Sequence, residues 1–86
     1  MSTSDIQSLI LKVLPDALVD VQDPNQDGQH FAATVVSGQF VGLTMVKQHK
    51  LVYDAIKPQL DSGVIHAMQL KTYTPEKWQA NSVQFG

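Results

Sequence analysis

The sequence predicts an α+β fold, in which three strands form one mixed sheet and helices cover one face of it. Three observations support this class. Segments of helical periodicity and short Val-rich segments follow one another in the order α-β-β-α-β-α. A turn-rich segment joins the first two strands as a hairpin, and a helical segment connects the second strand to the third. Because such a crossover has to pack against the sheet, we expect the helices on one face.

The first predicted element is an amphipathic helix that ends before Pro15. Its apolar residues recur with helical spacing at Ile6, Leu9, Ile10, Val13 and Leu14. Ser2 or Ser4 can serve as the N-cap, and Asp5 in the first turn favours the positive end of the helix dipole. This helix therefore has one apolar face to bury against the rest of the fold.

Two strands and a turn follow. Residues 18–23 alternate between apolar and polar side chains and predict a short, half-buried strand. Residues 24–28 form a dense cluster of turn formers, in which Gly28 can adopt a positive φ. Residues 30–36 predict a second strand, so the two strands form a hairpin with a loop longer than the tightest type.

The second helix is predicted to start after Thr44, which can act as its N-cap. Its apolar face is spaced at Met45, His49, Val52 and Ile56. Pro58 conflicts with a continuous helix, because proline removes one helical hydrogen bond and clashes with the carbonyl four residues back. Two alternatives follow: the helix ends near Ile56, or its last turn is kinked or restarted.

The remaining elements are a strand and a short helix. Residues 64–72 predict the third strand. Thr74 can act as an N-cap, Pro75 stands at the first helical position, and Glu76 places an acid in the first turn. A short terminal helix should therefore run through Trp78. We expect a single domain over residues 1–79 and a flexible tail over residues 80–86, which has little to anchor it.

The composition limits the possible functions. The 86 residues are 43% hydrophobic and 16% charged, which is typical of one globular domain. Six Lys, no Arg and a formal net charge of -2 do not indicate a strongly basic nucleic-acid surface. The absence of Cys excludes disulfides, zinc-thiolate sites and a Cys nucleophile from this chain. With no apolar stretch of about 18 to 20 residues and no signal peptide, we expect a soluble cytoplasmic protein without membrane contact.

Residues 23–28 match the D-x-N-x-D-G opening of an EF-hand calcium loop. The rest of that loop does not fit, because its twelfth position needs a bidentate carboxylate and is Thr34 here. The flanking segments also predict strands rather than helices. We therefore interpret the match as a turn built from turn-forming residues.

No motif in the sequence predicts an enzyme. The glycines form no phosphate-binding loop, since neither G-x-G-x-x-G nor Gly-Lys-Ser/Thr occurs. The strained nucleophile turn G-x-S-x-G is also missing, and the carboxylates fall mostly in turns or at exposed strand positions. We expect a protein without catalytic activity of its own.

Three histidines are candidate ligands, because neutral imidazole binds iron, zinc or copper. His30 follows the hairpin turn, and His66 lies near the start of the third strand. Strands that enter a sheet from the same side could bring these two side chains together. A lone histidine is more often a surface or partly buried residue, and this alternative stays open. His49, on the apolar face of the second helix, is expected to pack.

Three segments resemble the sequence signatures of the BolA family. Residues 40–56 (FVGLTMVKQHKLVYDAI) resemble F-x-G-x-x-x-V-x-R-H-R-x-V-y-x-A-L. Residues 65–67 and 70–78 resemble the C-terminal signature of that family, and residues 28–31 look like its G-S-H-F hairpin segment. The resemblance covers residues 5–79 and implies a fold similar to the class II KH domain, in agreement with the predicted element order.

This resemblance implies a partner protein rather than an enzyme. BolA-like proteins pair with monothiol glutaredoxins and share a bridging [2Fe-2S] cluster with them, in iron-sulfur trafficking or in iron and redox regulation. The C-terminal histidine ligand of the family falls on His66, and His30 is the matching candidate for the second ligand. The glutaredoxin and glutathione would supply thiolates, which fits a chain without Cys. Alone, the chain is expected to be a monomer without a cofactor.

The same resemblance allows a DNA-binding transcriptional regulator as an alternative, because some BolA-like proteins have that role. Such a function needs the basic residues Lys47, Lys50, Lys71 and Lys77 on one face. Lys47 and Lys50 belong to the only basic cluster, for which a solvated helix face is the simpler interpretation. The R-H-R of the family lies in the segment K-Q-H-K here, without the bidentate fork of arginine. No KH-type G-x-x-G loop follows Gly42, so we place DNA binding second.

Overall fold

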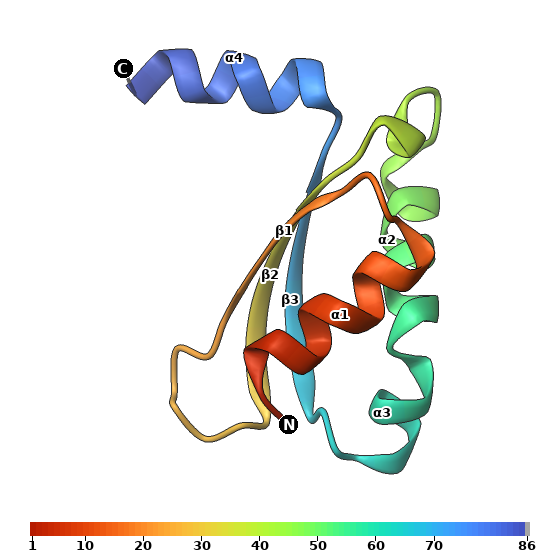
Figure 1. Ribbon diagram of the computed structural model, residues 1–86, viewed down its shortest axis with the longest axis vertical. Helices are drawn as coiled ribbons and strands as arrows, with labels where there is room; N and C mark the ends of the chain where they lie inside the picture. Colours follow the sequence, from red (N-terminus) through yellow and green to blue (C-terminus); the bar gives the residue numbers. More distant parts are fainter. Residues whose placement is uncertain (86) are drawn as a thin grey trace.

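The chain folds into a three-stranded sheet flanked by helices (Figure 1). The computed structural model describes the backbone of residues 1–85 and the side chains of residues 1–80. The elements are α1 (Thr3–Val13), β1 (Leu18–Gln22), β2 (His30–Val36), the 3-10 helix η1 (Gly38–Phe40), α2 (Met45–Ala55), α3 (Lys57–Ser62), β3 (Ala67–Tyr73) and α4 (Pro75–Phe85). The predicted order is confirmed, with the second helix divided into α2 and α3. None of the described helices is long and apolar enough to cross a lipid bilayer.

The sheet has the strand order β1-β2-β3 and is mixed, as predicted. β1 and β2 form the antiparallel hairpin. β2 and β3 are parallel, with His30 opposite Ala67 at one end and Val36 opposite Tyr73 at the other. Parallel neighbours need a crossover connection, which η1, α2 and α3 supply here. Consequently, the first residues of β2 and β3 lie at the same end of the sheet.

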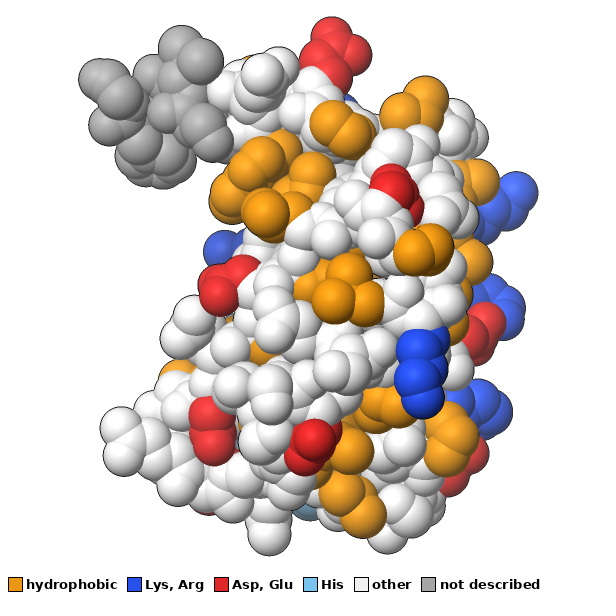
Figure 2. Space-filling view, viewed as in Figure 1, with side chains coloured by type: hydrophobic (Ala, Val, Ile, Leu, Met, Phe, Trp, Pro, Cys, Tyr) orange, Lys and Arg blue, Asp and Glu red, His pale blue; other side chains and the backbone are white. Residues whose placement is uncertain are grey.

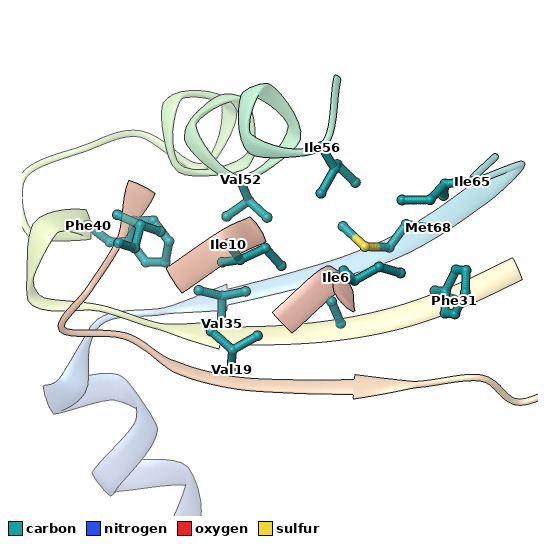
Figure 3. Packing of buried hydrophobic residues seen from close by; sticks show 12 residues of the cluster. Ile6, Ile10, Val19, Phe31, Val35, Phe40, Val52, Ile56, Ile65 and Met68 are labelled. Carbon is teal, nitrogen blue, oxygen red and sulfur yellow. The ribbon is translucent and has the colours of Figure 1, made fainter. Parts of the chain in front are cut away.

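The helices α1, α2 and α3 lie on one face of the sheet, as the sequence predicted (Figure 1). The core fills the space between these helices and the strands (Figure 3). Side chains alternate along a strand, so every second residue of β2 points into this core. The buried core consists of Ile6, Ile10, Leu14, Val19, Phe31, Ala33, Val35, Phe40, Val52, Ile56, Ile65 and Met68.

The structure decides between two pairs of alternatives at the helix ends. Ser2, and not Ser4, caps α1: its hydroxyl oxygen accepts the backbone N–H of Asp5 at 3.1 Å. The Asp5 carboxylate accepts the backbone N–H of Ser2 in return, at 3.0 Å. The second helix stops at Ala55 and restarts as α3, with Pro58 in the first turn of the new helix. Proline is tolerated at this position, because the backbone N–H groups of the first helical turn have no acceptor within the helix.

β3 begins at Ala67, later than the predicted start at residue 64. The preceding residues belong to the connection from α3, because the backbone N–H of Ile65 donates to the carbonyl of Gln59 at 3.0 Å. The Ile65 side chain fills the core from that connection. His66 therefore stands immediately before the strand rather than within it.

The terminal helix α4 leaves the sheet at the end opposite the hairpin loop (Figure 1). The Trp78 ring packs against that of Tyr73, with centroids 5.4 Å apart. The helix extends through Phe85, beyond the predicted end near Trp78, although its later residues are weak helix formers. The side chains of residues 81–86 and the backbone of Gly86 lie outside the described residues, and the flexibility of the tail stays a prediction.

Candidate metal centre

His30 and His66 lie side by side at the end of the sheet where β2 and β3 begin. The backbone N–H groups of His66 and Ala67 both donate to the carbonyl of Gln29, at 2.9 and 3.2 Å. These bonds tie the start of β3 to the residue before β2. The two imidazole centroids are 4.8 Å apart, with an interplanar angle of 57°. The structure thus brings together the two histidines that the sequence placed at strand starts.

Both imidazoles can be reached from outside the protein. The His30 side chain keeps 41% of its surface exposed, and His66 is also exposed. The residue after His30 shows the contrast, because Phe31 is 2% exposed and belongs to the core. A group on another molecule can therefore approach both rings while the core stays intact.

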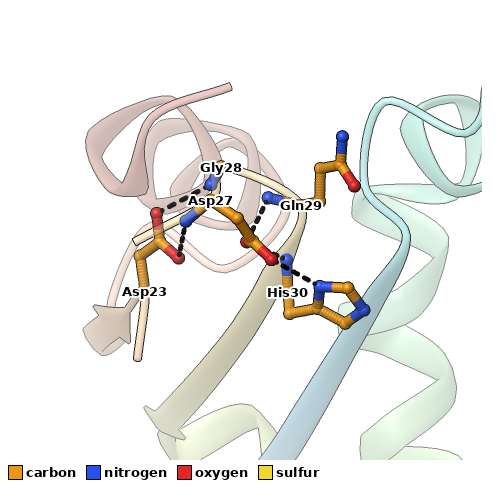
Figure 4. A network of polar contacts seen from close by, with 5 residues as sticks. All are labelled: Asp23, Asp27, Gly28, Gln29 and His30. Carbon is orange, nitrogen blue, oxygen red and sulfur yellow. Dashed lines mark hydrogen bonds and ion pairs between the residues drawn. The ribbon is translucent and has the colours of Figure 1, made fainter. Parts of the chain in front are cut away.

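Two aspartates build the turn between β1 and β2 (Figure 4). Asp23 accepts the backbone N–H groups of Asp27 and Gly28, at 3.3 and 3.0 Å. Asp27 accepts the backbone N–H groups of Gln29 and His30 through Oδ1, at 2.9 and 3.0 Å. Gly28 adopts a φ of 68°, a conformation that favours glycine. These contacts account for the EF-hand-like spacing as a hydrogen-bonded turn.

Asp27 also contacts the imidazole of His30, with Oδ2 2.8 Å from Nδ1. The backbone N–H of Gln29, the backbone N–H of His30 and the imidazole together lower the pKa of Asp27 from 3.8 to about 2. Hydrogen bonds to a carboxylate favour its charged form, so Asp27 is ionised at neutral pH. Among the described residues, Nδ1 is the ring nitrogen of His30 that forms a hydrogen bond.

The ligand set is a pair and not a complete metal site. No group of three His, Cys, Asp or Glu side chains among the described residues is arranged to hold a metal ion. Transition metals in proteins commonly take about four ligands or more. The pair thus offers two imidazole nitrogens, and the remaining ligands of any metal centre would have to come from another molecule.

The third histidine does not join the pair. His49 lies on α2, where its ring meets that of Tyr53 edge-on at a centroid distance of 6.3 Å. The Tyr53 hydroxyl donates to the carbonyl of Met68 at 2.8 Å, which links α2 to β3. His49 is half-buried against its own helix, and the buried residues of α2 are Gln48 and Val52. The predicted apolar face is therefore correct at Val52 but not at Met45, which is 53% exposed.

The candidate DNA-binding lysines do not form one surface. Lys47 and Lys50 lie on α2. Lys71 is exposed on β3, and because side chains alternate along a strand it points away from the face on which Thr72 is buried under α2. In Figure 2 the lysines along the right-hand edge, over α2 and α3, alternate with carboxylates. Among them, the Lys50 ammonium group and the Asp54 carboxylate form an ion pair with an N–O distance of 2.9 Å.

Sequence reasoning missed Asp27 as part of this site, because it treated residues 23–28 only as a turn. A signal was present in the spacing, since Asp27 stands three residues before the candidate ligand His30. Aspartates in turns often accept hydrogen bonds from residues just beyond them. An aspartate in a turn just before a candidate histidine ligand, as Asp27 is here, is therefore itself a candidate site residue.

The fold and the site define a small α+β protein with an exposed, incomplete pair of imidazole ligands. A comparison with known families is more specific. The family model described as "BolA-like protein" matches residues 4–77. The chain therefore belongs to the BolA-like family, and the resemblance noted from the sequence is confirmed.

Known proteins match nearly the whole chain. The acid stress protein IbaG of Escherichia coli K12 is 33% identical over 78 residues, which cover 91% of this chain and 89% of IbaG. A Vibrio cholerae protein named DNA-binding transcriptional regulator BolA is 36% identical over 78 residues, or 90% of this chain and 71% of that protein. The structure of a bolA protein homologue from Coxiella burnetii matches with a TM-score of 0.77 and 38% identity, covering 92% of this chain and 97% of that one. None of these three names describes an enzyme.

Proposed function

We propose that this chain is a partner protein without catalytic activity of its own, which shares a bridging [2Fe-2S] cluster with a monothiol glutaredoxin. His66 and His30 are the nitrogen ligands, and the glutaredoxin and glutathione supply the thiolates. The role lies in iron-sulfur trafficking or in iron and redox regulation in the cytoplasm, where thiols stay reduced. The observation that carries this proposal is the exposed pair of imidazoles beside the hairpin loop.

The spacing of the two rings suits joint ligation of one iron ion. An imidazole nitrogen binds a transition metal at about 2 Å, which puts the ring centroid roughly 3 Å from the ion. Two rings at about a right angle around one ion then have centroids about 4.5 Å apart. The observed separation of 4.8 Å is close to this value, so small rotations of the side chains suffice.

The composition of the chain favours a shared cluster over an internal one. Iron-sulfur clusters are held mostly by thiolates, and in Rieske centres two imidazoles replace two of them. This chain has no Cys, and the described residues place no third ligand beside the pair. A partner that brings thiolates would complete the site, and the exposure of both rings leaves an approach for it.

Mixing the apo protein with a cluster-loaded monothiol glutaredoxin tests the proposal. Replacement of thiolate by imidazole ligands alters the visible circular dichroism of the cluster, so we expect a new spectrum on addition of the wild-type chain. The variants His66→Ala and His30→Ala should each abolish or shift this spectrum, because each removes a nitrogen ligand. The measurement is a titration of the loaded glutaredoxin with each variant.

The His49→Ala variant is the matched control, because it removes an imidazole from α2 and leaves the pair intact. It should reproduce the wild-type spectrum. Failure of the wild-type chain to change the spectrum of the glutaredoxin would exclude cluster sharing. A new spectrum that survives His66→Ala unchanged would exclude His66 as a ligand.

DNA binding is the second candidate, because the relative from Vibrio cholerae is named as a DNA-binding transcriptional regulator. The charge distribution favours it less: the formal net charge is -2, and Lys71 points away from the surface that carries Lys47 and Lys50. Each phosphate contact adds about 0.9 to the slope of log affinity against log salt concentration. Fluorescence anisotropy of a labelled duplex at several salt concentrations measures that slope, and a steep slope whose magnitude falls by about 0.9 in Lys47→Ala would favour the regulator.

A further inference from the structure

A carboxylate beside one member of the histidine pair decides which ring nitrogen is free. We propose that Asp27 is a positioning residue, which holds the imidazole proton of His30 on Nδ1 and so leaves Nε2 as the ligand atom. The ligand part of this inference rests on the proposed function. The proton part concerns the protein alone and can be measured without a partner.

The other contacts of Asp27 fix the direction of its hydrogen bond to the ring. Its Oδ1 already accepts two backbone N–H groups, those of Gln29 and His30. Its Oδ2 lies 2.8 Å from Nδ1 of His30. An ionised carboxylate can only accept, and an aspartate carboxyl is ordinarily ionised at neutral pH. The proton between Oδ2 and Nδ1 is therefore carried by the imidazole.

The proton on Nδ1 prepares His30 to act as a metal ligand through its other ring nitrogen. A neutral imidazole carries one proton, so a proton on Nδ1 leaves the lone pair on Nε2. In Figure 4 the second ring nitrogen of His30 points away from Asp27. Metal-binding histidines commonly donate their other ring N–H to a carboxylate, which orients the ring and raises the basicity of the ligand nitrogen. His30 has this arrangement before any metal is bound.

The hairpin loop holds Asp27 in the position that this contact needs. Asp23 accepts the backbone N–H groups of Asp27 and Gly28, so the backbone that carries the Asp27 side chain is fixed from the preceding turn. The two aspartates that match an EF-hand opening thus act in series. Asp23 orients Asp27, and Asp27 orients His30.

His66 provides an internal comparison. Among the described residues, no carboxylate contacts its ring as Asp27 contacts that of His30. An imidazole without such a partner distributes its proton between the two nitrogens and favours Nε2. The two rings should therefore differ in the apo protein, with the proton of His30 on Nδ1 and that of His66 mainly on Nε2.

The variant Asp27→Asn separates proton placement from the structure of the loop. The amide oxygen can still accept the backbone N–H groups of Gln29 and His30, but the NH2 group that replaces Oδ2 can only donate. Nδ1 of His30 must then accept, which moves the ring proton to Nε2. Hydrogen–nitrogen correlation spectra of nitrogen-15-labelled protein report the tautomer of each histidine, at a pH above the imidazole range.

We expect His30 to carry its proton on Nδ1 in the wild-type protein and on Nε2 in Asp27→Asn, with His66 unchanged. The control is Asp20→Asn, an aspartate of β1 whose side chain contacts Gln22. It should keep the wild-type tautomer of His30. The inference would be overturned by a wild-type His30 with its proton on Nε2, or by a tautomer that Asp27→Asn does not change.

The ligand part has a separate readout in the mixed complex with glutaredoxin. Partners of metal ligands typically change metal affinity by about 10- to 100-fold, so we expect Asp27→Asn to weaken cluster retention by that factor. Cluster retention equal to wild type would reject the positioning role of Asp27. An Nδ1 proton on His30 in a protein that takes up no cluster would uphold the proton placement and reject the proposed function.

Discussion

Gln48 is a polar residue of α2 whose side chain is only 7% exposed. Its amide NH2 group donates to the carbonyl of Leu43 at 3.0 Å and to that of Phe40 at 3.4 Å. Its Oε1 accepts the hydroxyl hydrogen of Thr72 at 2.7 Å. A single amide therefore joins the η1 segment, α2 and β3, and satisfies polar groups that are cut off from water.

Replacement of this amide should lower the stability of the fold. In Gln48→Ala the carbonyl of Leu43 loses its partner, and the hydroxyl of Thr72 keeps only the weak acceptor Met45 Sδ at 3.2 Å. Buried polar groups cost about 1 to 3 kcal/mol when unsatisfied. We expect a loss of that size in the free energy of unfolding, measured by urea denaturation. Gln22→Ala is the control, because the Gln22 side chain is exposed and its amide donates to the exposed Asp20 carboxylate. Equal stability of both variants would contradict the structural role of Gln48.

The two histidines of the site could be predicted from the sequence, whereas the contact of Asp27 could not. His30 and His66 stand near strand starts, and parallel pairing brings strand starts together. The contact between Asp27 and the imidazole depends on the side-chain torsions of both residues, which spacing does not specify. The sequence pattern assigns no structural role to Gln48, and only the packing of α2 shows that it faces β3.

At the scale of elements, the patterns that predict strands and helices are local in the sequence. Alternation, helical spacing and turn residues can each be recognised within a short window, so the three strands and the order of the α-helices were predicted, whereas the short 3-10 helix η1 was not. The ends were predicted less well, because they depend on distant contacts. β3 starts at Ala67 since Ile65 bonds back to Gln59. The break at Pro58 was recognised, but only the packed structure shows that the helix restarts as α3 instead of ending near Ile56.

The turn that ends α3 can be tested at Gly63. Gly63 has a φ of 82°, and no atom lies within 4 Å of the position that a Cβ would take. The cost of Gly63→Ala is therefore conformational, about 1 to 2 kcal/mol for an L-residue in the left-handed region. Gly38→Ala is the control, because Gly38 has no positive φ and its nearest contact, Asp16 at 3.6 Å, is ordinary. Equal losses in the free energy of unfolding would contradict this explanation.

At the scale of the whole molecule, the two ends of the sheet carry different features. The hairpin loop and the starts of β2 and β3 hold the histidine pair at one end, and α4 leaves from the other (Figure 1). Asp16 ties the connection after α1 to η1 near that second end. Its carboxylate accepts the Ser37 hydroxyl, the Gly38 backbone N–H and the Gln39 side-chain amide. Each end thus depends on an ionised aspartate.

These aspartates predict a loss of stability in acid. The pKa of Asp16 is lowered from 3.8, chiefly by the Gln39 amide and the Ser37 hydroxyl, and that of Asp27 is lowered to about 2. Because both values are lower in the folded state, the unfolded chain binds more protons than the folded protein as the pH falls toward and below 3.8. We expect the urea midpoint to be constant from neutral pH to roughly pH 5 and to fall steadily below it.

The variant Asp16→Asn provides the control for this acid loss. It should lower the urea midpoint at neutral pH and make its decline in acid less steep, because one of the depressed carboxyl groups is gone. A wild-type midpoint that stays constant down to about pH 2 would contradict the linkage between these carboxylates and folding.

Binding of the shared cluster by imidazole nitrogens of this chain is tested most directly by pulsed electron paramagnetic resonance of the reduced complex with glutaredoxin. Labelling only the histidines of this chain with nitrogen-15 identifies the source of any coupled nitrogen. We expect couplings from two labelled nitrogens, both unchanged in His49→Ala, and we expect Asp27→Asn to weaken the coupling that belongs to His30. A wild-type complex with no coupling to a labelled nitrogen would contradict ligation by His30 and His66.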